Sequence, residues 1–439
     1  MGNILELDHV TEKASEHGTA ENGQVQYSAV GMKGWRVTME DCHTLCNALP
    51  VDGREEKLED HSLFAVYDGH GGSLTSQYAG ENFLRIFSNR SELKKYAALP
   101  LQGRKSRDDV TGIELLKNAL TKTFKDLDTE LRIAQSKRNE DIAKEEEEKE
   151  EKTETCKISS EESILRRMER SGSTCVVVML TPSHILCANA GDSRAILRKD
   201  GKALPLSFDH KPPNLPEQER IIAAGGFVKA KRVDGDLAVS RGLGDFAFKS
   251  EGEFSTHRQK VIPIPDIITC PRDTAKDEFI IIACDGIWDV ISNSECSDMV
   301  QSILDEGETN ITMVCEEILD TCLERNSRDN MTLVMVCLPG VKMSQKNFSN
   351  GAVVMKRRTA RQARILETQA KITAQHTAKS IKSMGLDFGS LGPLSKTDNS
   401  DKAGVGEMQC SNEEGNVKSS SGVQLRDQQQ LPTRTQDVA

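Results

Sequence analysis

Four acidic clusters lie far apart along this chain, and each stands next to an apolar, strand-like run. They read Met39-Glu40-Asp41, Tyr67-Asp68-Gly69-His70, Cys284-Asp285-Gly286 and Arg328-Asp329-Asn330. Carboxylates packed together raise each other's pKa, so gathering them is costly unless a cation compensates the charge. A fold that brings these clusters together therefore builds a pocket for divalent metal ions, which indicates phosphate chemistry.

The position of each cluster relative to its apolar run predicts a shared cleft. Apolar runs lead directly into Asp68, Asp192 and Asp285, so we expect these carboxylates at strand ends. Asp329 stands just before another such run, which places it at the same rim of an antiparallel sheet. A single Asp-Gly pair is a common turn. The combination is what favours a site.

The composition limits the classes of protein to consider. Hydrophobic residues make up 37% of the 439 residues and aromatic residues only 4%, which indicates one globular domain with long polar segments. A formal charge of −11 argues against a nucleic-acid partner, whose binding needs Lys and Arg to neutralise phosphates. An acidic enzyme can still act on anionic substrates when metal ions invert the local field.

The twelve cysteines do not form the pattern of a disulfide scaffold. Cys175, Cys187 and Cys284 sit inside apolar runs, where a free thiol behaves as a small hydrophobe. Reduced thiols predict a cytoplasmic or nuclear location. Cys42 and Cys46 leave a zinc site as a weaker alternative.

The N-terminal residues 1–24 are polar, and we expect a mobile segment there. Gly2 follows Met1, which raises N-myristoylation, but Glu6 stands where that pattern has Ser or Thr. We expect membrane association only if Gly2 is acylated, and one acyl chain gives reversible binding.

One folded domain is predicted over residues 25–340. An acidic insertion at about 134–170 interrupts it, and such a charge run forms a solvated loop or an exposed helical extension. A loop-rich stretch follows at about 208–260. Residues 341–439 are expected to be largely disordered, with a basic start around Lys356 to Arg364 that can form a helix.

Hydrophobic patterns predict the elements of this domain. Helices are predicted at 73–87 and 113–131, with two more between 294 and 325. Tight turns between neighbouring strands indicate antiparallel pairing, since parallel neighbours need long crossovers. The predicted strands are 62–67, 174–180, 184–190, 195–198, 279–283 and 331–338.

Several motifs in one order resemble the protein phosphatase 2C family, the metal-dependent serine/threonine phosphatases. The resemblance spans about Tyr27 to Leu338 and is highly specific, because the motifs are independent of one another. Besides the four acidic clusters, the motifs are Gly34-Trp35-Arg36, Ser171-Gly172-Ser173-Thr174, Gly191-Asp192-Ser193-Arg194, Asp209-His210-Lys211-Pro212, Leu237-Ala238-Val239-Ser240-Arg241 and Gly286-Ile287-Trp288-Asp289.

This resemblance implies an α+β fold, a four-layer α-β-β-α sandwich with two packed antiparallel sheets flanked by helices. It implies that residues 25–340 are a catalytic domain, in which the stretch 208–260 is a flap beside the cleft. It further implies a phosphoprotein phosphatase that hydrolyses phosphoserine and phosphothreonine, as a monomer.

The resemblance also implies roles for the acidic residues. Asp68 would bridge two Mg²⁺ or Mn²⁺ ions, and the Gly69 carbonyl would bind one of them. Glu40, Asp285 and Asp329 would ligate the other. Asp41 would hold metal-bound water, while Asp192 and Asp289 would join Asp285 around a weaker third ion.

Arg36 matches the family's phosphate-binding arginine and His70 its general acid. An all-oxygen ligand set suits Mg²⁺ or Mn²⁺ rather than zinc or copper. A hydroxide that bridges the two metals can attack phosphorus directly, so no phosphoenzyme intermediate is required. The planar guanidinium of Arg36 fits two phosphate oxygens. The imidazole of His70 can protonate the departing oxygen.

Each of these residues has a structural alternative. Arg36 could be a salt-bridge partner of Glu40, His70 could cap the helix that follows, and Asp192 could be a turn residue. Two other functions stay open as well. A catalytically silent relative would bind phosphoproteins as a scaffold, and a two-metal nuclease would cleave phosphodiesters, which the negative charge disfavours.

Overall fold

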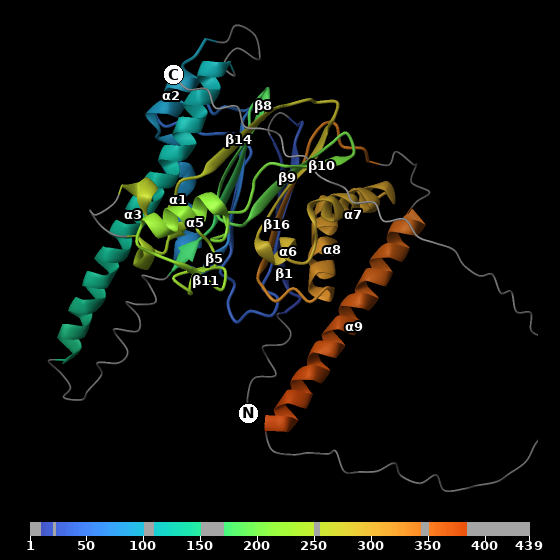
Figure 1. Cartoon of the computed structure of the whole chain (residues 1–439). Coiled ribbons are helices and arrows are strands. Elements are labelled where there is room, and N and C mark those ends of the chain that lie inside the picture. Colours follow the sequence, from blue (N-terminus) through green and yellow to red (C-terminus); the bar gives the residue numbers. More distant parts are fainter. Residues whose placement is uncertain are drawn as a thin grey trace, which may run out of the picture. The chain divides into compact units, whose positions relative to one another are not determined.

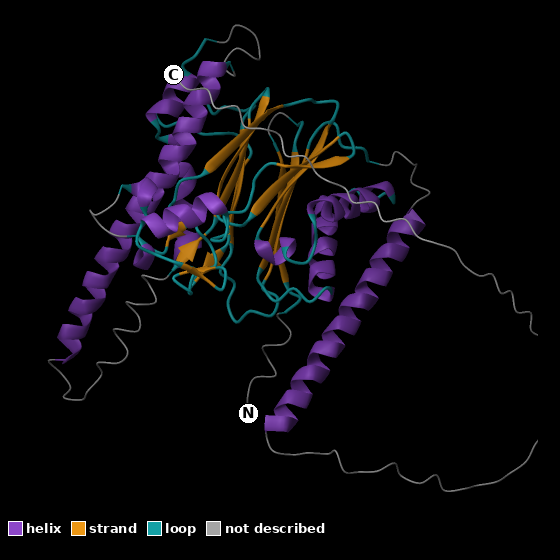
Figure 2. Ribbon diagram, in the orientation of Figure 1, coloured by secondary structure: helices purple, strands orange, loops and turns teal. Residues whose placement is uncertain are grey.

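The computed structural model describes residues 10–20, 23–100, 109–150, 171–249, 255–343 and 351–383. The elements described here lie in the first of two compact units, Met1–Ser380, except for the last residues of one helix. Two antiparallel sheets face each other in this unit and helices flank both of them (Figures 1 and 2). The predicted four-layer arrangement is confirmed.

The first sheet is antiparallel throughout. Its order is β1 (Lys13–Thr19), β2 (Gln26–Met32), β16 (Met331–Cys337), β15 (Asp277–Ala283), β9 (Arg194–Lys199) and β10 (Lys202–Pro205). The helices that pack on its outer face are α6 (Asp285–Trp288), α7 (Asn293–Asp305) and α8 (Ile311–Glu324). Side chains at the N-termini of the two longer helices cap their backbones: Ser292 accepts from the Glu295 amide, and Asn310 from the Thr312 amide.

The second sheet has the order β14 (Asp266–Pro271), β8 (His184–Ala190), β7 (Cys175–Leu180), β4 (Ser62–Tyr67) and β3 (Cys42–Cys46). The helices α1 (Leu74–Ser88), α2 (Ser91–Ala97) and α3 (Val110–Glu150) cover its outer face. On α1, the apolar residues Ala79, Phe83 and Phe87 recur at helical spacing and are buried against this sheet.

The central strands explain why the chain has continuous apolar runs. Every residue of β4, β7, β15 and β16 is buried. One face of each strand packs under the helices, and the other joins an inner layer between the sheets that includes Phe64, Val176, Ile280 and Val334. A strand buried on both faces needs apolar residues at consecutive positions rather than alternation.

Two small sheets lie beside the main ones. A three-stranded sheet is ordered β13 (Leu243–Gly244), β6 (Gly172–Ser173) and β5 (Gly69–His70). The hairpin β11 (Val228–Lys229) and β12 (Arg232–Val233) belongs to the stretch predicted as a flap, together with α5 (Leu215–Ala223). This stretch also holds the 3₁₀ helices η3 (Phe246–Phe248) and η4 (Thr256–Arg258). A separate small core of Ile221, Val233 and Val261 stabilises it.

The structure differs from the sequence prediction at the N-terminus. Residues 13–19 were expected in a mobile segment, but they form the edge strand β1, paired with β2 from Lys13↔Met32 to Thr19↔Gln26. An edge strand can be polar because backbone hydrogen bonds, rather than buried side chains, hold it in place. Gly2 and Glu6 lie outside the described residues.

The acidic insertion and the tail are described in part. Helix α3 continues to Glu150, so the start of the insertion is a helical extension, and 151–170 lie outside the described residues. The basic start of the tail lies on α9 (Gly351–Ser383), whereas 384–439 are outside. Among the described helices none has the length and apolar character to cross a membrane.

Candidate active site

Carboxylates from both sheets meet at one rim. Asp68 directly follows β4 and Asp41 directly precedes β3, both in the second sheet. Asp285 opens α6 just after β15, and Asp329 lies just before β16, both in the first sheet. Asp192 lies in the turn between β8 and β9, which belong to different sheets. The prediction that the acidic residues lie at strand ends is therefore correct.

A cavity of about 600 Å³ opens at this rim. The acidic side chains that line it face three cationic ones and the edge of the flap. Its lining includes Asp68, Asp192, Asp285, Asp289, Asp329, Arg36, Lys211, Arg232, Gly69, His70, Thr174 and Asp245.

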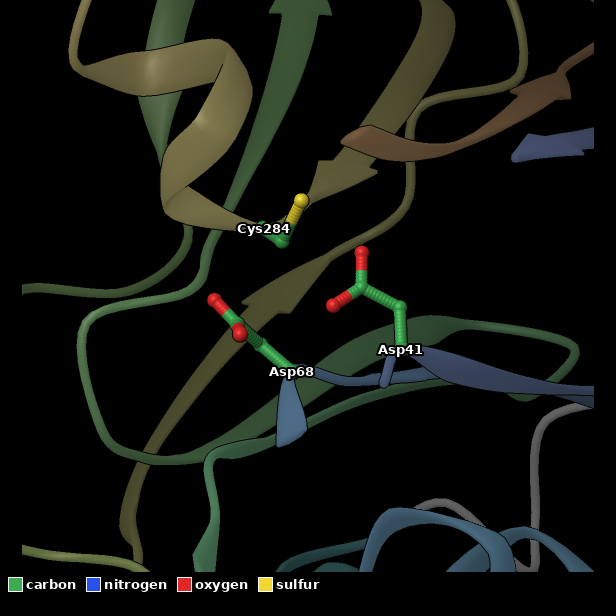
Figure 3. A group of neighbouring side chains, drawn as sticks. All are labelled: Asp41, Asp68 and Cys284. Atoms are coloured by element: carbon green, nitrogen blue, oxygen red, sulfur yellow. The ribbon is translucent and has the colours of Figure 1, made fainter. Parts of the chain in front are cut away.

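In the described part of the chain, two groups of side chains are close enough to hold a cation. Potential ligand atoms of Asp68, Asp192 and Asp285 all lie within 4.8 Å of one another, and so do those of Asp41, Asp68 and Cys284. Asp68 belongs to both groups, as a bridging ligand would. Figure 3 shows the side chains of Asp41, Asp68 and Cys284 gathered in one place, although they come from distant parts of the sequence.

The electrostatics of this cluster fit bound divalent cations. Burial, reinforced by Asp285 and Asp41, raises the pKa of Asp68 well above its usual range. Burial and the neighbouring Asp192 raise the pKa of Asp285 to about 8. Burial also raises the pKa of Asp41 to about 6. Carboxyl groups held this close are costly to ionise unless a cation offsets their charge.

Asp41 has one oxygen available for a ligand. Its Oδ2 accepts a hydrogen bond from Thr332 Oγ1 at 2.7 Å, whereas its Oδ1 is buried and has no hydrogen-bond partner among the described residues. Buried polar atoms are rarely left unsatisfied, so this oxygen is suited to accept from a bound water or to ligate a cation. This observation supports a metal-bound water or a cation at Asp41.

Cys284 places a thiol in the cluster, but a thiol is a poor ligand for hard cations. Its Sγ donates to the Asn330 carbonyl at 3.4 Å and accepts from the Thr332 amide at 3.1 Å. Burial raises the pKa of this thiol well above its ordinary value, so it stays neutral. The donor set that remains is made of oxygen, which suits Mg²⁺ or Mn²⁺.

Residues that do not line the cavity hold the carboxylate of Glu40 in place. Its Oε1 accepts from Thr38 Oγ1 at 2.7 Å, and its Oε2 accepts from the Gly72 amide at 3.1 Å. It does not line the cavity that contains Asp285 and Asp329, within the part of the chain that the structure describes. Its role as a ligand stays a prediction.

Gly69 lines the cavity, and its surroundings exclude any side chain. A Cβ atom there would lie 2.2 Å from the Glu40 carbonyl oxygen and 2.7 Å from Ser76 Oγ. The absence of a side chain therefore lets the chain of Asp68-Gly69 approach the loop of Glu40.

Arg36 pairs with Asp329 and not with Glu40. Its Nη2 lies 2.6 Å from Asp329 Oδ2, and its side chain is 56% exposed. Burial would lower the pKa of Arg36, but Asp329, Asp285 and Asp68 raise it further, so the guanidinium stays charged. A planar cation thus borders the acidic cluster from the solvent side.

His70 contacts a residue that the sequence analysis did not single out. Its Nε2 lies 2.9 and 3.0 Å from the two carboxylate oxygens of Asp245. Burial would lower the pKa of His70, but the Asp245 carboxylate outweighs it and raises this pKa. The N-cap residue of the following helix α1 is Ser73, so His70 does not cap it.

Asp192 and Asp289 line the same cavity as Asp285. Lys211 Nζ forms an ion pair with Asp192. The pKa of Asp289 is raised, because burial and the charge of Asp192 outweigh the lowering effect of Lys211. Lys211 and Asp245 are the functional candidates that sequence reasoning missed. The motif Asp209-His210-Lys211-Pro212 contains the first, and the pair Gly244-Asp245 was a weak local signal for the second.

Comparisons with known proteins agree with this fold and cleft. The family model described as Protein phosphatase 2C matches residues 25–331. Protein phosphatase 1A from Homo sapiens is 36% identical over 361 residues, which cover 82% of this chain and 83% of that protein. Protein phosphatase 1B from Bos taurus is 39% identical over 337 residues, which cover 77% of this chain and 61% of that protein.

Among solved structures, that of serine-threonine phosphatase 2C from Toxoplasma gondii is similar, with a TM-score of 0.56 and 21% sequence identity. The match covers 74% of this chain and 99% of the other. Fold, cleft and relatives together define a protein phosphatase of the metal-dependent type. The chain belongs to the protein phosphatase 2C family.

Proposed function

We propose that this protein is a Mg²⁺- or Mn²⁺-dependent phosphatase that removes phosphate from phosphoserine and phosphothreonine in other proteins. The observation that carries the proposal is the convergence of carboxylates from both sheets with Arg36 in one cavity. Acidic ligands for hard cations next to a guanidinium fit a phosphate monoester.

The cations would be held by the residues that the sequence analysis named. Asp68 would be shared by two ions, and Asp285, Asp329, Glu40 and the Gly69 carbonyl would complete their ligands. Asp41 would hold a water, and Asp192 with Asp289 would hold a weaker third ion beside Asp285. When bound, two such ions supply an acidified water as the nucleophile and neutralise charge on the phosphoryl oxygens.

Arg36 would orient the substrate. Its exposed guanidinium can leave Asp329 and donate two parallel hydrogen bonds to phosphate oxygens, which places phosphorus next to the acidic cluster. The loss of one partly exposed ion pair costs little. Arg36 is therefore free to exchange a carboxylate for a phosphate.

The lining of the cavity supports hydrolysis without a phosphoenzyme. Neither serine nor cysteine belongs to the described residues that line it, and the only hydroxyl there is that of Thr174. Thr174 Oγ1 accepts from the Asp68 amide at 3.2 Å and is 2.7 Å from Ser193 Oγ. A hydroxyl bonded in this way is a poor nucleophile, so water is the reactant.

His70 would complete the reaction by protonating the seryl or threonyl oxygen as it departs. It lines the same cavity as Arg36 and lies on β5, two residues after Asp68. General-acid catalysis contributes roughly 10²–10⁴ in rate.

We propose a cytoplasmic or nuclear location. All described cysteines are free thiols, which supports a cytoplasmic or nuclear protein. We propose phosphoproteins as the only macromolecular substrates of the cleft, acted on by a monomer.

The test is turnover of a phosphothreonine peptide by the purified chain in Mg²⁺ or Mn²⁺. Asp68→Asn and Asp285→Asn should reduce turnover to the level measured with EDTA, because each removes a charged ligand. Asp60→Asn, at an exposed position away from the cleft, should keep full turnover. A wild-type chain that binds the metal and the peptide but releases no phosphate would instead be a phosphoprotein-binding scaffold. Cleavage of a nucleotide diester in preference to the peptide would indicate a nuclease.

A further inference from the structure

The carboxylate of Asp245 is buried and faces the imidazole of His70. Its side chain is 1% exposed, and both of its oxygens lie within 3.0 Å of His70 Nε2. An ionised carboxylate can only accept, so Nε2 carries the hydrogen of this contact. No hydrogen bond engages His70 Nδ1 within the described residues, and Nδ1 is not among their buried unsatisfied atoms. It is therefore the ring nitrogen accessible from the cavity.

The small three-stranded sheet creates this contact. Strand β6 pairs with β5 on one side and with β13 on the other, so that His70 and Gly244 both lie opposite Gly172. Asp245 comes directly after Gly244 in a left-handed conformation, with φ of 53°, and its amide donates to the Ser171 carbonyl at 3.0 Å. The backbone thereby turns the Asp245 side chain back across β6.

Gly172 leaves the space through which the two side chains meet. A Cβ atom at this position would lie 2.2 Å from Asp245 Oδ2 and 2.3 Å from His70 Nε2. Any other residue at 172 would push the carboxylate and the ring apart. The glycine in the motif Ser171-Gly172-Ser173-Thr174 is thus required by a contact between two side chains that are distant in sequence.

A purely structural role does not account for a buried carboxylate here. Within the described chain, its one ion-pair partner is His70, since the nearby Lys249 pairs with Asp128 at 2.7 Å. Burying a carboxylate costs several kcal/mol, which a neutral side chain of the same size would avoid. Among the described residues, His70 is therefore the one cationic partner that the carboxylate of Asp245 can stabilise.

We propose that Asp245 is a positioning residue for the phosphatase reaction, which fixes the ring of His70 so that Nδ1 faces the departing oxygen of the substrate. The inference rests on the proposed function of His70. As the bond from phosphorus to the seryl or threonyl oxygen breaks, its electron pair stays on that oxygen, which takes the proton from Nδ1. His70 is left neutral, with Nε2–H still bonded to Asp245, and regains a proton from water.

The experiment compares two substrates with different leaving groups. A phosphothreonine peptide has a poor leaving group and needs the acid, whereas p-nitrophenyl phosphate has a good one and does not. For Asp245→Ala, kcat on the peptide should fall about 10²-fold, at an unchanged KM and with little change on the aryl phosphate. Asp245→Asn keeps a hydrogen-bond acceptor and should recover at least about tenfold of this loss.

A double-mutant cycle shows whether Asp245 acts through His70. In a His70→Gln background, Asp245→Ala should cause no further loss on the peptide. Gly172→Ala keeps both residues and should reproduce the selective loss, which also provides the test if Asp245→Ala does not fold.

Any one of four outcomes overturns the proposal. One is a loss of equal size on both substrates for Asp245→Asn and Gly172→Ala. Another is an effect of Asp245→Ala that is as large in the His70→Gln background as in the wild type. If instead His70→Gln itself shows no preference between the substrates, the acid role in the proposed function fails as well. If His70→Gln loses activity selectively on the peptide and Asp245→Ala does not, only the positioning role of Asp245 is overturned.

Discussion

At the scale of single residues, the guanidinium of Arg36 has the simplest geometry to test. It lies at the rim of the cavity, and among the described residues it pairs only with the partly exposed Asp329. Arg36→Ala should raise KM for a phosphopeptide by about tenfold or more, because one charge-assisted, bidentate contact contributes about 1.5–3 kcal/mol. Steady-state kinetics in saturating Mg²⁺ measures this change.

Arg36→Lys is the matched control. It keeps the positive charge but loses the planar fork, so its KM should fall between those of the wild type and Arg36→Ala. An unchanged KM for Arg36→Ala would mean that this residue does not contact the phosphate.

Single residues also differ in whether the sequence could predict their place in the site. Asp68 and Asp285 could be located because each follows a run of buried residues that ends at the rim of a sheet. Asp245 could not, since its partner is 175 positions away and the contact depends on the glycine of a third strand. The alternative pairing of Arg36 with Glu40 is not observed for a similar reason, because Asp329 approaches Arg36 from the far end of the domain.

At the scale of elements, helix α9 packs through its arginines against acidic residues of α8 and the residues before it. Arg361 is 6% exposed, with Nε 2.8 Å from Asp320 and Nη2 2.8 Å from Glu316. Arg357 and Arg358 pair with Glu317 and Glu308. The basic patch in the sequence predicted a helix there but could not identify what it binds, since these pairs join residues far apart in the chain.

Arg361→Ala should destabilise the docking of α9 by about 2 kcal/mol, because Glu316 loses its ion-pair partner and the buried Asp320 keeps only Lys13 among the described cations. Hydrogen exchange of the α9 backbone amides should then become faster, while the central strands keep their protection. Lys356→Ala is the control. Lys356 is exposed on the same helix and forms no ion pair among the described residues, so its loss should change stability by less than about 0.5 kcal/mol. Equal exchange rates in the two variants would contradict the buried ion pairs.

Several strands that are buried along their whole length were predicted from the sequence. The strands β4, β7 and β15 were identified almost to the residue, because burial on both faces requires an uninterrupted apolar run. The strand β1 was missed. Its side chains are mostly exposed and polar, and its position depends on backbone pairing with β2, which leaves no pattern in the sequence.

At the scale of the whole molecule, the acidic cluster links stability to pH and to cations. A carboxyl group whose pKa is higher in the folded than in the unfolded chain binds more protons when folded. Asp285 has a folded pKa of about 8 against about 3.9 for a free aspartate, so without cations stability should fall as the pH rises from about 4 to 8. Between pH 6 and 8 we expect the free energy of unfolding to fall by about 1 kcal/mol, after allowing for screening at this partly exposed site.

Urea unfolding in EDTA at the two pH values measures this loss. With saturating Mg²⁺ the loss should disappear or reverse, because bound cations favour the ionised carboxylates and stabilise only the folded state. Asp285→Asn in EDTA should flatten the dependence. A cation-free chain that is equally stable at pH 6 and pH 8 would show that the cluster carries no electrostatic strain.

The layer between the two sheets has a further consequence. Asp68 extends from one sheet and Asp285 from the other, and closely packed side chains such as Phe64 and Ile280 separate these sheets. Because such an interior has little free volume, its thickness determines how wide a gap the cations must bridge. Shortening one inner side chain far from the rim would alter that gap, so an apparently silent change in the interior could stop turnover in a chain that still folds.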